Sequence, residues 1–440
     1  MISDLEQKYS TPVEQFPEPM SREAFHGITG EIINAITPHS EACKEAVLIQ
    51  LLVGFGNIIG RNAHTWIGND KHHCNEFCAV VGDTGLARKG TSWGLVGSLL
   101  TLLDEAWALR RVRHGFPSGE SIIYHVRDPR FSNDGERTVA DEGVTDKRLL
   151  INEAEFARLL RASANSGNTL SPTLRVSWDA PKLLTNSGKT AGDEATEAHI
   201  SAILHITRCD LEVNLNRQDI GNGLGNRILW GASRRVQKIS RPRRIDWNAE
   251  SDIVPCLKQC VATATEKPRE FGFSRSAEKA WDAFYQGIPE IPGPVGQMTT
   301  RMDAHAIRLA MIYAALDRVS QVDECHIKAA VSVVEYCNRT VKWLFSTTMG
   351  DKDTNLLLRA LKNEPEGMGR TEIYRDVFNN NRSAESISGM LTDLRTNGLV
   401  GVLGRKGSRD SEVWFAVEHE ATAKPVSTLT KLGASNTSNT

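Results

Sequence analysis

No segment of the chain is a continuous hydrophobic run long enough to cross a membrane. The longest apolar stretch, AVLIQLLVGFGNIIG, is interrupted by three glycines, whereas a membrane-spanning helix needs about 20 consecutive apolar residues. The N-terminal region also lacks the basic start and apolar run of a signal peptide. These absences predict a cytoplasmic protein without a membrane partner.

The cysteines are too scattered for a disulfide framework. Eight of them are spread over 440 residues, unlike the dense spacing of a small secreted domain, so we expect reduced thiols. The segment HHCNEFC gathers histidine and cysteine, but zinc sites usually need a second pair of ligands elsewhere, which the sequence does not supply. A buried apolar role for Cys78 is therefore favoured over zinc.

The chain also lacks an excess of either charge. Its formal net charge is −2, with 40% hydrophobic and 24% charged residues, which is typical of a soluble globular protein. Nucleic-acid binding would therefore have to come from local basic patches. A length of 440 residues exceeds what one core accommodates and predicts two or three domains.

Alternating helix and strand patterns predict an α/β fold. Residues 22–60 and 91–112 have helical periodicity, and short apolar runs typical of buried strands occur in FCAVVG, RLLINE, HISAILHIT and NRILWGA. This alternation favours a parallel sheet with helices on both faces. The pattern becomes helical again over residues 274–345.

The chain is expected to contain five segments. They are an N-terminal arm and helical region (1–75), the sheet domain (76–245), a helical domain (246–350), a winged helix-turn-helix (351–418) and a disordered tail (419–440). In the winged helix, the helix from Ser383 would enter a DNA groove, and Arg405, Lys406 and Arg409 would contact phosphates from the wing tip. Protein docking is the alternative, because SAESISGMLTDL is not strongly basic.

A glycine-rich segment, VVGDTGLARKGTSWG, follows the first buried strand of the expected sheet. Gly82, Gly85 and Gly90 allow the tight turns in which backbone N–H groups surround a phosphate, and the helix that follows directs its N-terminus at the anion. The segment therefore predicts a phosphate-binding loop. The alternative is a strand-to-helix turn with solvated basic residues.

The same loop carries candidate cations and hydroxyls. Lys89, with Arg88 beside it, would reach the outer phosphates of ATP, and Thr91 or Ser92 would offer a hydroxyl to Mg²⁺. The lysine precedes the third glycine, which reverses the usual order. Taken alone, the loop does not establish a nucleotide site.

A second element of such a site is a carboxylate at the end of a neighbouring strand. Glu153 and Glu155 follow the apolar run RLLIN, and one would bind Mg²⁺ through water while the other would polarise the attacking water. Glu153 is the candidate metal residue. The alternative is a pair of solvated glutamates at a helix start, where acidic residues are favoured.

Further candidates follow the last two strands. Thr207, with Arg208, ends a buried strand and could sense the terminal phosphate, and Arg227 could act on the nucleotide of a neighbouring subunit. A structural ion pair is the alternative for Arg227. In the basic segment after the last strand, Arg234 and Arg235 would line a channel for single-stranded DNA, or form a solvated surface.

The order of these motifs resembles a family of P-loop ATPases from phages, plasmids, prophages and integrative elements. The family is known only as a domain of unknown function and is often fused behind a primase-polymerase domain. The resemblance rests on NEFCAVVGDTGLARKGTSWG, DKRLLINEAEFARLL, AHISAILHIT, NGLGNRILW and RLAMIYAALD, in this order, and it covers about residues 24–416. The reversed order RKGTS belongs to the family's own pattern.

The resemblance implies a RecA-like core, a helical region and a winged helix. It assigns the phosphate role to Lys89 and Thr91, the acidic role to Glu153 and Glu155, and the arginine role to Arg227. It further implies a replicative helicase of a mobile element. We expect ATP and Mg²⁺ as cofactors, a ring oligomer such as a hexamer, and a separate primase as a partner. The alternatives are an initiator or regulator that uses ATP as an assembly switch, and an ATPase of a defence system.

Overall fold

The computed structural model describes residues 16–83, 85, 87–131, 139–185, 193–215, 217–247, 252–345, 352–396, 398–404 and 412–417. The described residues divide at Asn355 into two compact units. Helices that are both long and apolar enough to cross a membrane are absent from this part of the chain.

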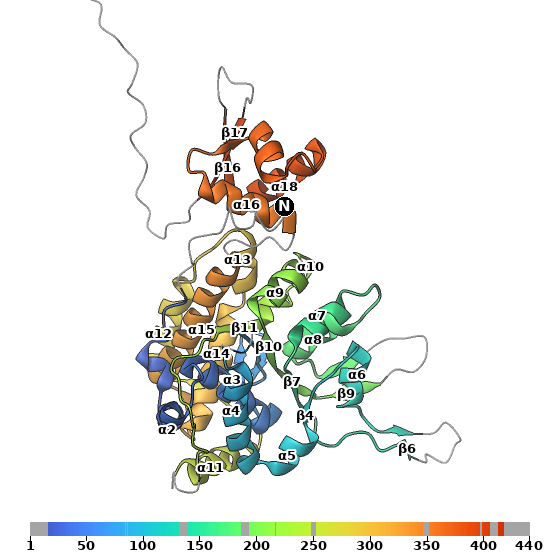
Figure 1. Ribbon diagram of the computed structural model, residues 1–440. Coiled ribbons are helices and arrows are strands. Elements are labelled where there is room, and N and C mark those ends of the chain that lie inside the picture. The colour runs from blue at the N-terminus through green and yellow to red at the C-terminus, as the bar shows by residue number, and fades with distance from the viewer. Residues whose placement is uncertain are drawn as a thin grey trace, which may run out of the picture. The chain divides into compact units, whose positions relative to one another are not determined.

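The larger unit is built around a five-stranded parallel sheet (Figure 1). In spatial order its strands are β11 (Ile228–Ala232), β3 (Phe77–Val81), β10 (His199–Ile206), β7 (Arg148–Glu153) and β4 (Val112–Arg113). Every residue of β3, β10 and β11 is buried, which explains their continuous apolar runs. The predicted α/β fold with a parallel sheet is confirmed, and the carboxyl ends of β3, β10 and β7 lie at one edge.

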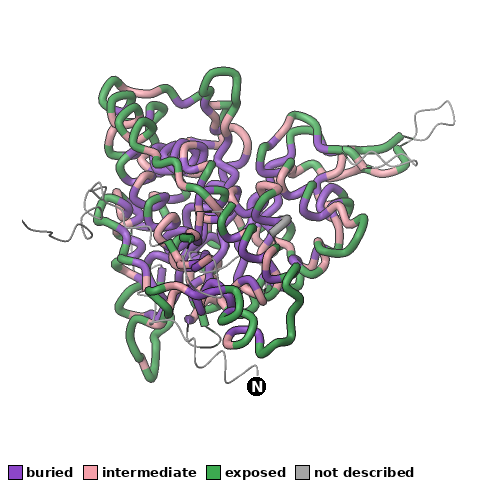
Figure 2. The backbone as a smooth tube through the Cα atoms, turned by 90° about the horizontal axis from the view of Figure 1, so that it is seen from above, coloured by how far each residue is buried: buried purple, intermediate pink, exposed green. Residues whose placement is uncertain are grey.

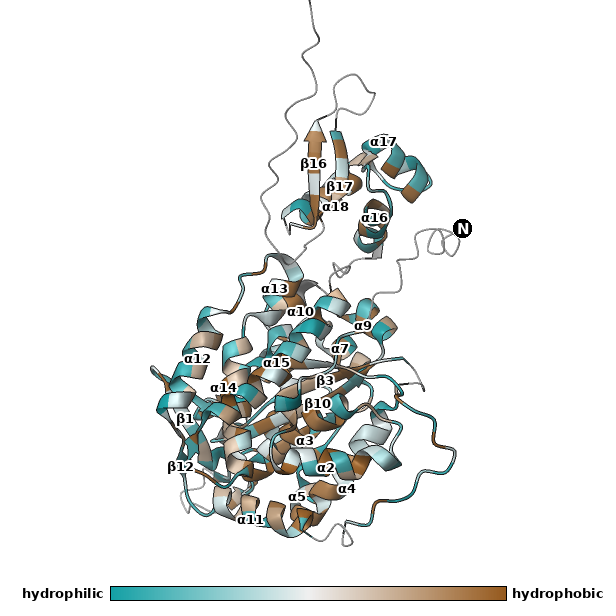
Figure 3. Cartoon of the chain, turned by 90° about the vertical axis from the view of Figure 1, so that its left-hand side faces the viewer, coloured by the Kyte–Doolittle hydropathy of each residue, from teal (hydrophilic) through white to brown (hydrophobic). Residues whose placement is uncertain are grey.

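Helices cover both faces of this sheet because successive side chains along a strand point to opposite faces. Cys78 and Ile203 contribute to one core together with residues of α3 (Lys44–Ile59), α4 (Lys89–Leu103), α11 (Ile253–Thr265) and α14 (Met302–Leu316). Ala79 and Leu204 contribute to the other core with residues of α6 (Gly119–Tyr124), α7 (Phe156–Ser163), α8 (Leu170–Asp179) and α9 (Arg208–Asn214). Figure 2 shows that the buried residues lie in the interior, and Figure 3 shows the hydrophobic residues of the strands and of the helices that cover them.

The remaining helices complete the larger unit. The long helix α15 (Glu324–Phe345) packs against the edge strand β11, where Tyr336 donates a hydrogen bond of 2.7 Å to the carbonyl of Ala232. The other elements of this unit include α2 (Ile28–Ile36), α5 (Glu105–Arg110), α10 (Arg217–Gly221), α12 (Arg275–Gln286), α13 (Gly293–Thr299) and a small sheet of β12 (Arg269–Glu270), β1 (Ala63–Ile67) and β2 (Asp70–His73). The helical pattern predicted for residues 274–345 is confirmed.

The single helix predicted over residues 91–112 is wrong. The chain forms α4 and α5 with a break at Asp104, whose backbone is extended and whose Oδ1 accepts a hydrogen bond of 2.8 Å from the N–H of Trp107. Asp104 thus caps the second helix, because an N-cap carboxylate satisfies an N–H that has no partner within the helix. The last residue of the expected helix, Val112, belongs to β4.

The smaller unit contains three helical segments and a three-stranded sheet. The helical segments are α16 (Lys352–Asn363), a short helix α17 (Arg370–Glu372) that continues into a π-helical turn η5 (Ile373–Val377), and α18 (Ala384–Thr396). The sheet runs in the order β15 (Met368–Gly369), β17 (Glu412–Ala416) and β16 (Val400–Gly404), with antiparallel pairing. The chain between β16 and β17, with Arg405, Lys406 and Arg409, lies outside the described residues.

Candidate functional site

The glycine-rich loop connects the carboxyl end of β3 to the start of α4. The N–H of Gly82 donates a hydrogen bond of 3.2 Å to the carbonyl of Ile206, which fixes the start of the loop to the end of β10. A side chain at Gly82 would lie 2.2 Å from the carbonyl oxygen of Ser233, so only glycine fits there. Gly85 has a φ of +67°, a conformation that glycine adopts without strain, and Gly90 faces open space at the helix start.

Lys89 is the first residue of α4, and its side chain folds back over the loop. Its Nζ donates a hydrogen bond to the carbonyl of Gly82 and lies 3.5 Å from the carbonyl oxygen of Asp83. Burial lowers the pKa of Lys89, while Asp83 and Asp210 oppose that shift. The ammonium group is therefore placed against the start of the loop, although the lysine itself precedes the third glycine.

Arg88, the other candidate cation, is held differently. Its backbone is left-handed, with a φ of +54°, and its guanidinium forms an ion pair of 2.6 Å with Glu41. Glu41 also accepts a hydrogen bond of 2.7 Å from the N–H of Ile239, in the segment that follows β11. The charge of Arg88 is thus balanced by the N-terminal region, whereas Lys89 points into the loop.

Thr91 and Ser92, which the sequence leaves as alternative Mg²⁺ ligands, have different environments. Ser92 is fully buried, and its Oγ donates to the carbonyl of Lys89 at 2.6 Å while accepting from Gln50 Nε2 at 2.7 Å. Both hydrogen-bonding capacities are used inside the protein. Thr91 is exposed in the first turn of α4, so it is the hydroxyl residue of the two that is accessible to solvent.

A buried hydrogen-bonded chain continues from Ser92 to the central strand. Gln50 donates through Nε2 to Ser92 and to the carbonyl of Ala46, so its Oε1 accepts from His205 Nε2 at 2.9 Å. Burial lowers the pKa of His205 to about 4, with a smaller contribution from the charge of Lys89. The imidazole is therefore neutral near pH 7, and it connects β10 through α3 to the first turn of α4.

The two candidate glutamates are placed unequally. Glu153 ends β7 and is buried, and its Oε2 accepts hydrogen bonds of 3.0 Å from the N–H of Gly115 and from Arg158. Glu155 is exposed at the start of α7. Because β10 separates β7 from β3, Glu153 lies about 10 Å across the sheet from the loop strand, at a strand spacing of about 4.8 Å. Glu153 is thus the glutamate fixed at the edge of the sheet.

Thr207 lies beside the loop at the end of β10. It directly follows Ile206, which accepts the hydrogen bond of Gly82. As the N-cap of α9, its Oγ1 accepts the N–H of Asp210 at 3.0 Å and donates to Asp210 Oδ2 at 2.7 Å. The next residue, Arg208, is directed to other partners. Its guanidinium lies over the ring of Trp343 at 4.8 Å and pairs with Glu212 at 3.2 Å. Of the two, Thr207 is the one placed at the loop.

Arg227 lies at the opposite edge of the sheet, just before β11 begins. Its Nη2 forms an ion pair of 2.8 Å with Asp179 Oδ2, and its Nη1 donates to the carbonyl of Gly223 at 2.8 Å. The guanidinium is buried near the ring of Trp178, which Arg301 and Arg308 also contact. The structural ion pair considered from the sequence is present, and the expected role towards a neighbouring subunit stays a prediction.

Arg234 and Arg235 follow β11 directly and lie next to the glycine loop. Together with Asp83, Ala87 and Ser233 they line a cavity of about 260 Å³. The guanidinium of Arg234 lies 4.3 Å from the centre of the Phe16 ring. Two residues that the sequence assigns to DNA are thus neighbours of the candidate phosphate loop.

The histidine and cysteine clusters do not fit a metal centre. In the segment HHCNEFC, burial raises the pKa of Cys74 and Cys78 and lowers that of His73 to about 2, as expected for core residues. Among the described residues, one set of at least three potential ligands lies close enough together to hold an ion, and it consists of His26, Cys325 and His326 rather than residues of HHCNEFC.

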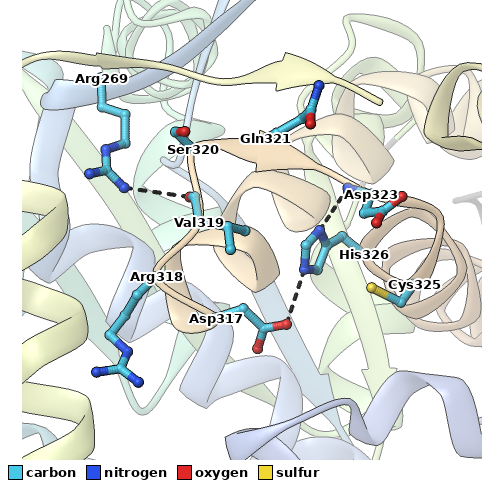
Figure 4. Close-up of a pocket in the computed structure, with 9 residues that line it drawn as sticks. All are labelled: Arg269, Asp317, Arg318, Val319, Ser320, Gln321, Asp323, Cys325 and His326. Atoms are coloured by element: carbon cyan, nitrogen blue, oxygen red, sulfur yellow. Dashed lines mark hydrogen bonds and ion pairs between the residues drawn. The ribbon is translucent and has the colours of Figure 1, made fainter. Parts of the chain in front are cut away.

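Hydrogen bonds around His326 explain why this second cluster does not suit a metal. His326 Nδ1 accepts the N–H of Asp323 at 2.8 Å, so Nε2 carries the ring proton and donates to Asp317 at 3.1 Å (Figure 4). Both ring nitrogens are therefore engaged, although a metal ligand needs one nitrogen with a free lone pair. The same carboxylate oxygen lies 2.7 Å from His26 Nε2.

Comparisons with known proteins do not identify a family for this chain. No protein-family model matches the chain, and a search of curated proteins finds no match.

Sequence reasoning missed Gln50 and His205. A signal for them exists, because His199, Ser201 and His205 occur at a spacing of two or four in a strand that is otherwise apolar. Polar residues on one face of a buried strand need buried partners. The sequence of that strand does not indicate that these partners would come from α3.

Proposed function

We propose that this protein is a P-loop ATPase whose nucleotide site is the loop between β3 and α4. The observation that carries the proposal is the side chain of Lys89, which folds over the carbonyl of Gly82 inside a glycine loop at the N-terminus of a 15-residue helix. A strand, a glycine loop with a cation against its start, and a helix N-terminus together make a site for a triphosphate. The neighbouring strand ends supply the other groups that such a site needs.

Each of these groups has a role in the proposal. Lys89 binds the outer phosphates, and Glu153 orients the water that attacks the terminal phosphate. Thr207 contacts that phosphate by exchanging the bond from its hydroxyl to Asp210, which its half-buried position permits. Glu155, exposed two residues further on, stays the alternative for that last role. Backbone N–H groups of the loop and of the first turn of α4 balance the remaining phosphate charge.

The residues present also fit Mg²⁺. The hydroxyl of the exposed Thr91 is a hard oxygen ligand at the helix start, and the carboxylate of Glu153 is suited to contact through a water molecule. When bound, Mg²⁺ would neutralise charge on the phosphate oxygens. Ser92 takes no part, because its hydroxyl is used by Gln50 and by the carbonyl of Lys89.

We further propose that the ATPase acts on DNA as a translocase or helicase with a RecA-like core and a C-terminal winged helix, in the replication of a mobile element. The basic segment that follows β11 supports DNA contact by its composition, since beyond Arg235 it contains Lys238, Arg241, Arg243 and Arg244. The order of elements in the smaller unit supports the winged helix: three helical segments, with the short strand β15 after the first, are followed by the antiparallel pair β16 and β17. Wing residues Arg405, Lys406 and Arg409 would contact phosphates.

In a ring, Arg227 would face the nucleotide of the adjacent subunit. To do so it has to exchange its ion pair with Asp179, whose side chain is 44% exposed and therefore accessible at such an interface. Sedimentation with and without ATP and Mg²⁺ tests this proposal. A protein that stays monomeric at micromolar concentration excludes the role of Arg227 in trans.

The nucleotide site is tested by Lys89→Ala. We expect loss of ATP turnover with an unchanged unfolding transition, because Lys89 bonds only to loop carbonyls. The matched control is Lys258→Ala, which removes an exposed lysine of α11 and leaves turnover unchanged. If Lys89→Ala hydrolyses ATP at the wild-type rate, the assignment of the site is wrong.

The action on DNA is tested separately. DNA-stimulated ATP turnover together with strand displacement supports a helicase. Slow, DNA-independent hydrolysis with sequence-specific duplex binding supports instead an initiator or regulator that uses ATP as an assembly switch. Both assays use the full chain, with single-stranded and duplex oligonucleotides compared at one stated salt concentration.

A further inference from the structure

A cavity of about 260 Å³ adjoins the glycine loop on the side of β11. It is lined by Asp83 and Ala87 of the loop and by Ser233, Arg234 and Arg235, which follow β11. Two hydrogen bonds fix Ser233, one of the residues that line the cavity. Ser233 donates from its N–H to the carbonyl of Val81 and from its Oγ to the carbonyl of Ala87, each at 2.7 Å. The segment after β11 is thus bonded to the loop itself.

The strand order sets the direction in which a bound nucleotide extends. In the order β11-β3-β10-β7-β4, Thr207 follows β10 and Glu153 ends β7, and both strands lie on one side of the loop strand β3. A triphosphate whose terminal phosphate faces these two residues runs back across the loop towards β11. Its nucleoside then arrives where the cavity lies.

We propose that this cavity is the nucleoside subsite of the ATPase, and that Arg235 and Arg234 contact the base and ribose rather than DNA. This inference rests on the proposed ATPase function and adds to it the side of the loop on which the base is bound. The volume is slightly below that of pockets for whole drug-sized ligands, which begin at about 300 Å³. That size suits part of a nucleotide whose phosphates lie outside, on the loop.

The lining residues match the chemistry of a nucleoside. A guanidinium stacks on the face of a planar aromatic ring, and Arg234 already has such a contact with Phe16 at 4.3 Å. The half-buried Arg235 can stack on the base or donate to it. The exposed carboxylate of Asp83 can accept hydrogen bonds from the ribose hydroxyls.

The test compares ATP with inorganic tripolyphosphate, which has the phosphates but no nucleoside. Both are titrated calorimetrically, with Mg²⁺, into the wild type, Arg235→Ala, Arg234→Ala and Lys89→Ala. The control is Arg110→Ala, which removes an exposed arginine of α5. Thermal unfolding establishes that each variant is folded, and fluorescence polarisation measures binding to a single-stranded oligonucleotide.

We expect Arg235→Ala to weaken ATP about tenfold, since a stacked guanidinium contributes on the order of one factor of ten, and to leave tripolyphosphate within about twofold. Arg234→Ala should act in the same direction, and Arg110→Ala should change neither ligand. Equal weakening of ATP and tripolyphosphate, or no change in either, overturns the subsite. Weaker DNA binding with unchanged ATP affinity also overturns it, in favour of the DNA role.

Failure of the underlying ATPase proposal gives a different pattern. Lys89→Ala should weaken both ATP and tripolyphosphate, because Lys89 contacts phosphates only. If the wild type binds neither ligand, or if Lys89→Ala binds both as well as the wild type does, the loop is not the phosphate site. If Lys89→Ala weakens both ligands but neither Arg235→Ala nor Arg234→Ala weakens ATP selectively, the nucleoside subsite is wrong and the phosphate site stands.

Discussion

Gln50 Nε2 lies 2.7 Å from Ser92 Oγ, and through this contact a buried residue of α3 holds the first turn of the helix that follows the glycine loop. The hydroxyl of Ser92 is consequently not available to a ligand, whereas that of the exposed Thr91 is. We therefore expect Ser92 to stabilise the start of the helix and Thr91 to act as the metal ligand.

This separation is tested by two alanine variants. Thr91→Ala should raise the Mg²⁺ concentration needed for half-maximal ATP turnover and leave the free energy of unfolding nearly unchanged. Ser92→Ala should lower that free energy by about 1–3 kcal/mol, because it leaves the buried amide of Gln50 without a partner. Urea denaturation and Mg²⁺ titration of turnover measure the two effects. The opposite pattern would assign the metal to Ser92.

Glu153 at the end of β7 and Glu155 two residues further on should differ in their effect on catalysis. Glu153→Gln keeps an acceptor for the N–H of Gly115 but removes the carboxylate, so we expect retained ATP binding and a loss of at least about 100-fold in kcat. Glu155→Gln, at an exposed position, should cause the smaller loss. Single-turnover hydrolysis and ATP affinity are measured for both variants. A larger loss at Glu155 would reverse the two roles.

Gly82 in the loop and Gly94 in the following helix should respond in opposite directions to substitution by alanine. At Gly82 a Cβ would lie 2.2 Å from the carbonyl oxygen of Ser233, so Gly82→Ala should lower the free energy of unfolding by about 1–3 kcal/mol and weaken ATP binding. Gly94, inside α4, faces open space. Gly94→Ala should therefore stabilise the protein by about 0.4–1 kcal/mol, measured by urea denaturation. A neutral Gly82→Ala would contradict the close packing of the loop on Ser233.

Acidification should destabilise the protein through its buried histidines. Burial lowers the pKa of His199 to about 3 and that of His205 to about 4. The unfolded chain, with an ordinary histidine pKa near about 6.5, binds protons that the folded chain does not. Their contribution to stability is thus complete above about pH 6.5 and is lost as the pH falls towards the folded values.

Urea denaturation between pH 7 and pH 5 measures this loss, which amounts to about 1.4 kcal/mol per pH unit for each histidine within its window. In His205→Gln the slope of the free energy of unfolding against pH should decrease by the amount that corresponds to about one proton taken up on unfolding. An unchanged slope in that variant would contradict a neutral, buried His205.

The elements that sequence reasoning predicted correctly are those that a local pattern defines. β3, β7, β10 and β11 are apolar runs, and the loop after β3 is marked by its own glycines, so their places could be read one segment at a time. The break at Asp104 was also locally encoded, since aspartate is a preferred N-cap. It was missed because apolar periodicity continues across it.

The contacts that organise the site join segments far apart in the chain. Ser92 lies 42 residues from Gln50, and Arg227 lies 48 residues from Asp179. Nothing near Arg88 in the sequence indicates that Glu41 will balance its charge. Such pairs follow from the packing of α3 and of the N-terminal region on the sheet, which hydrophobic periodicity does not specify.

The polar side chains of β10 have a further consequence for how the protein reaches this fold. His199, Ser201 and His205 all face α3, where they meet Gly56, Asn57 and Gln50. A shift of β10 by one residue would turn these side chains into the opposite core, against the aromatic residues Phe77, Trp178 and Trp230. Each would then be buried without a partner. The polar side chains of β10 therefore raise the free energy of misaligned pairings during folding, and they also stabilise the correct pairing.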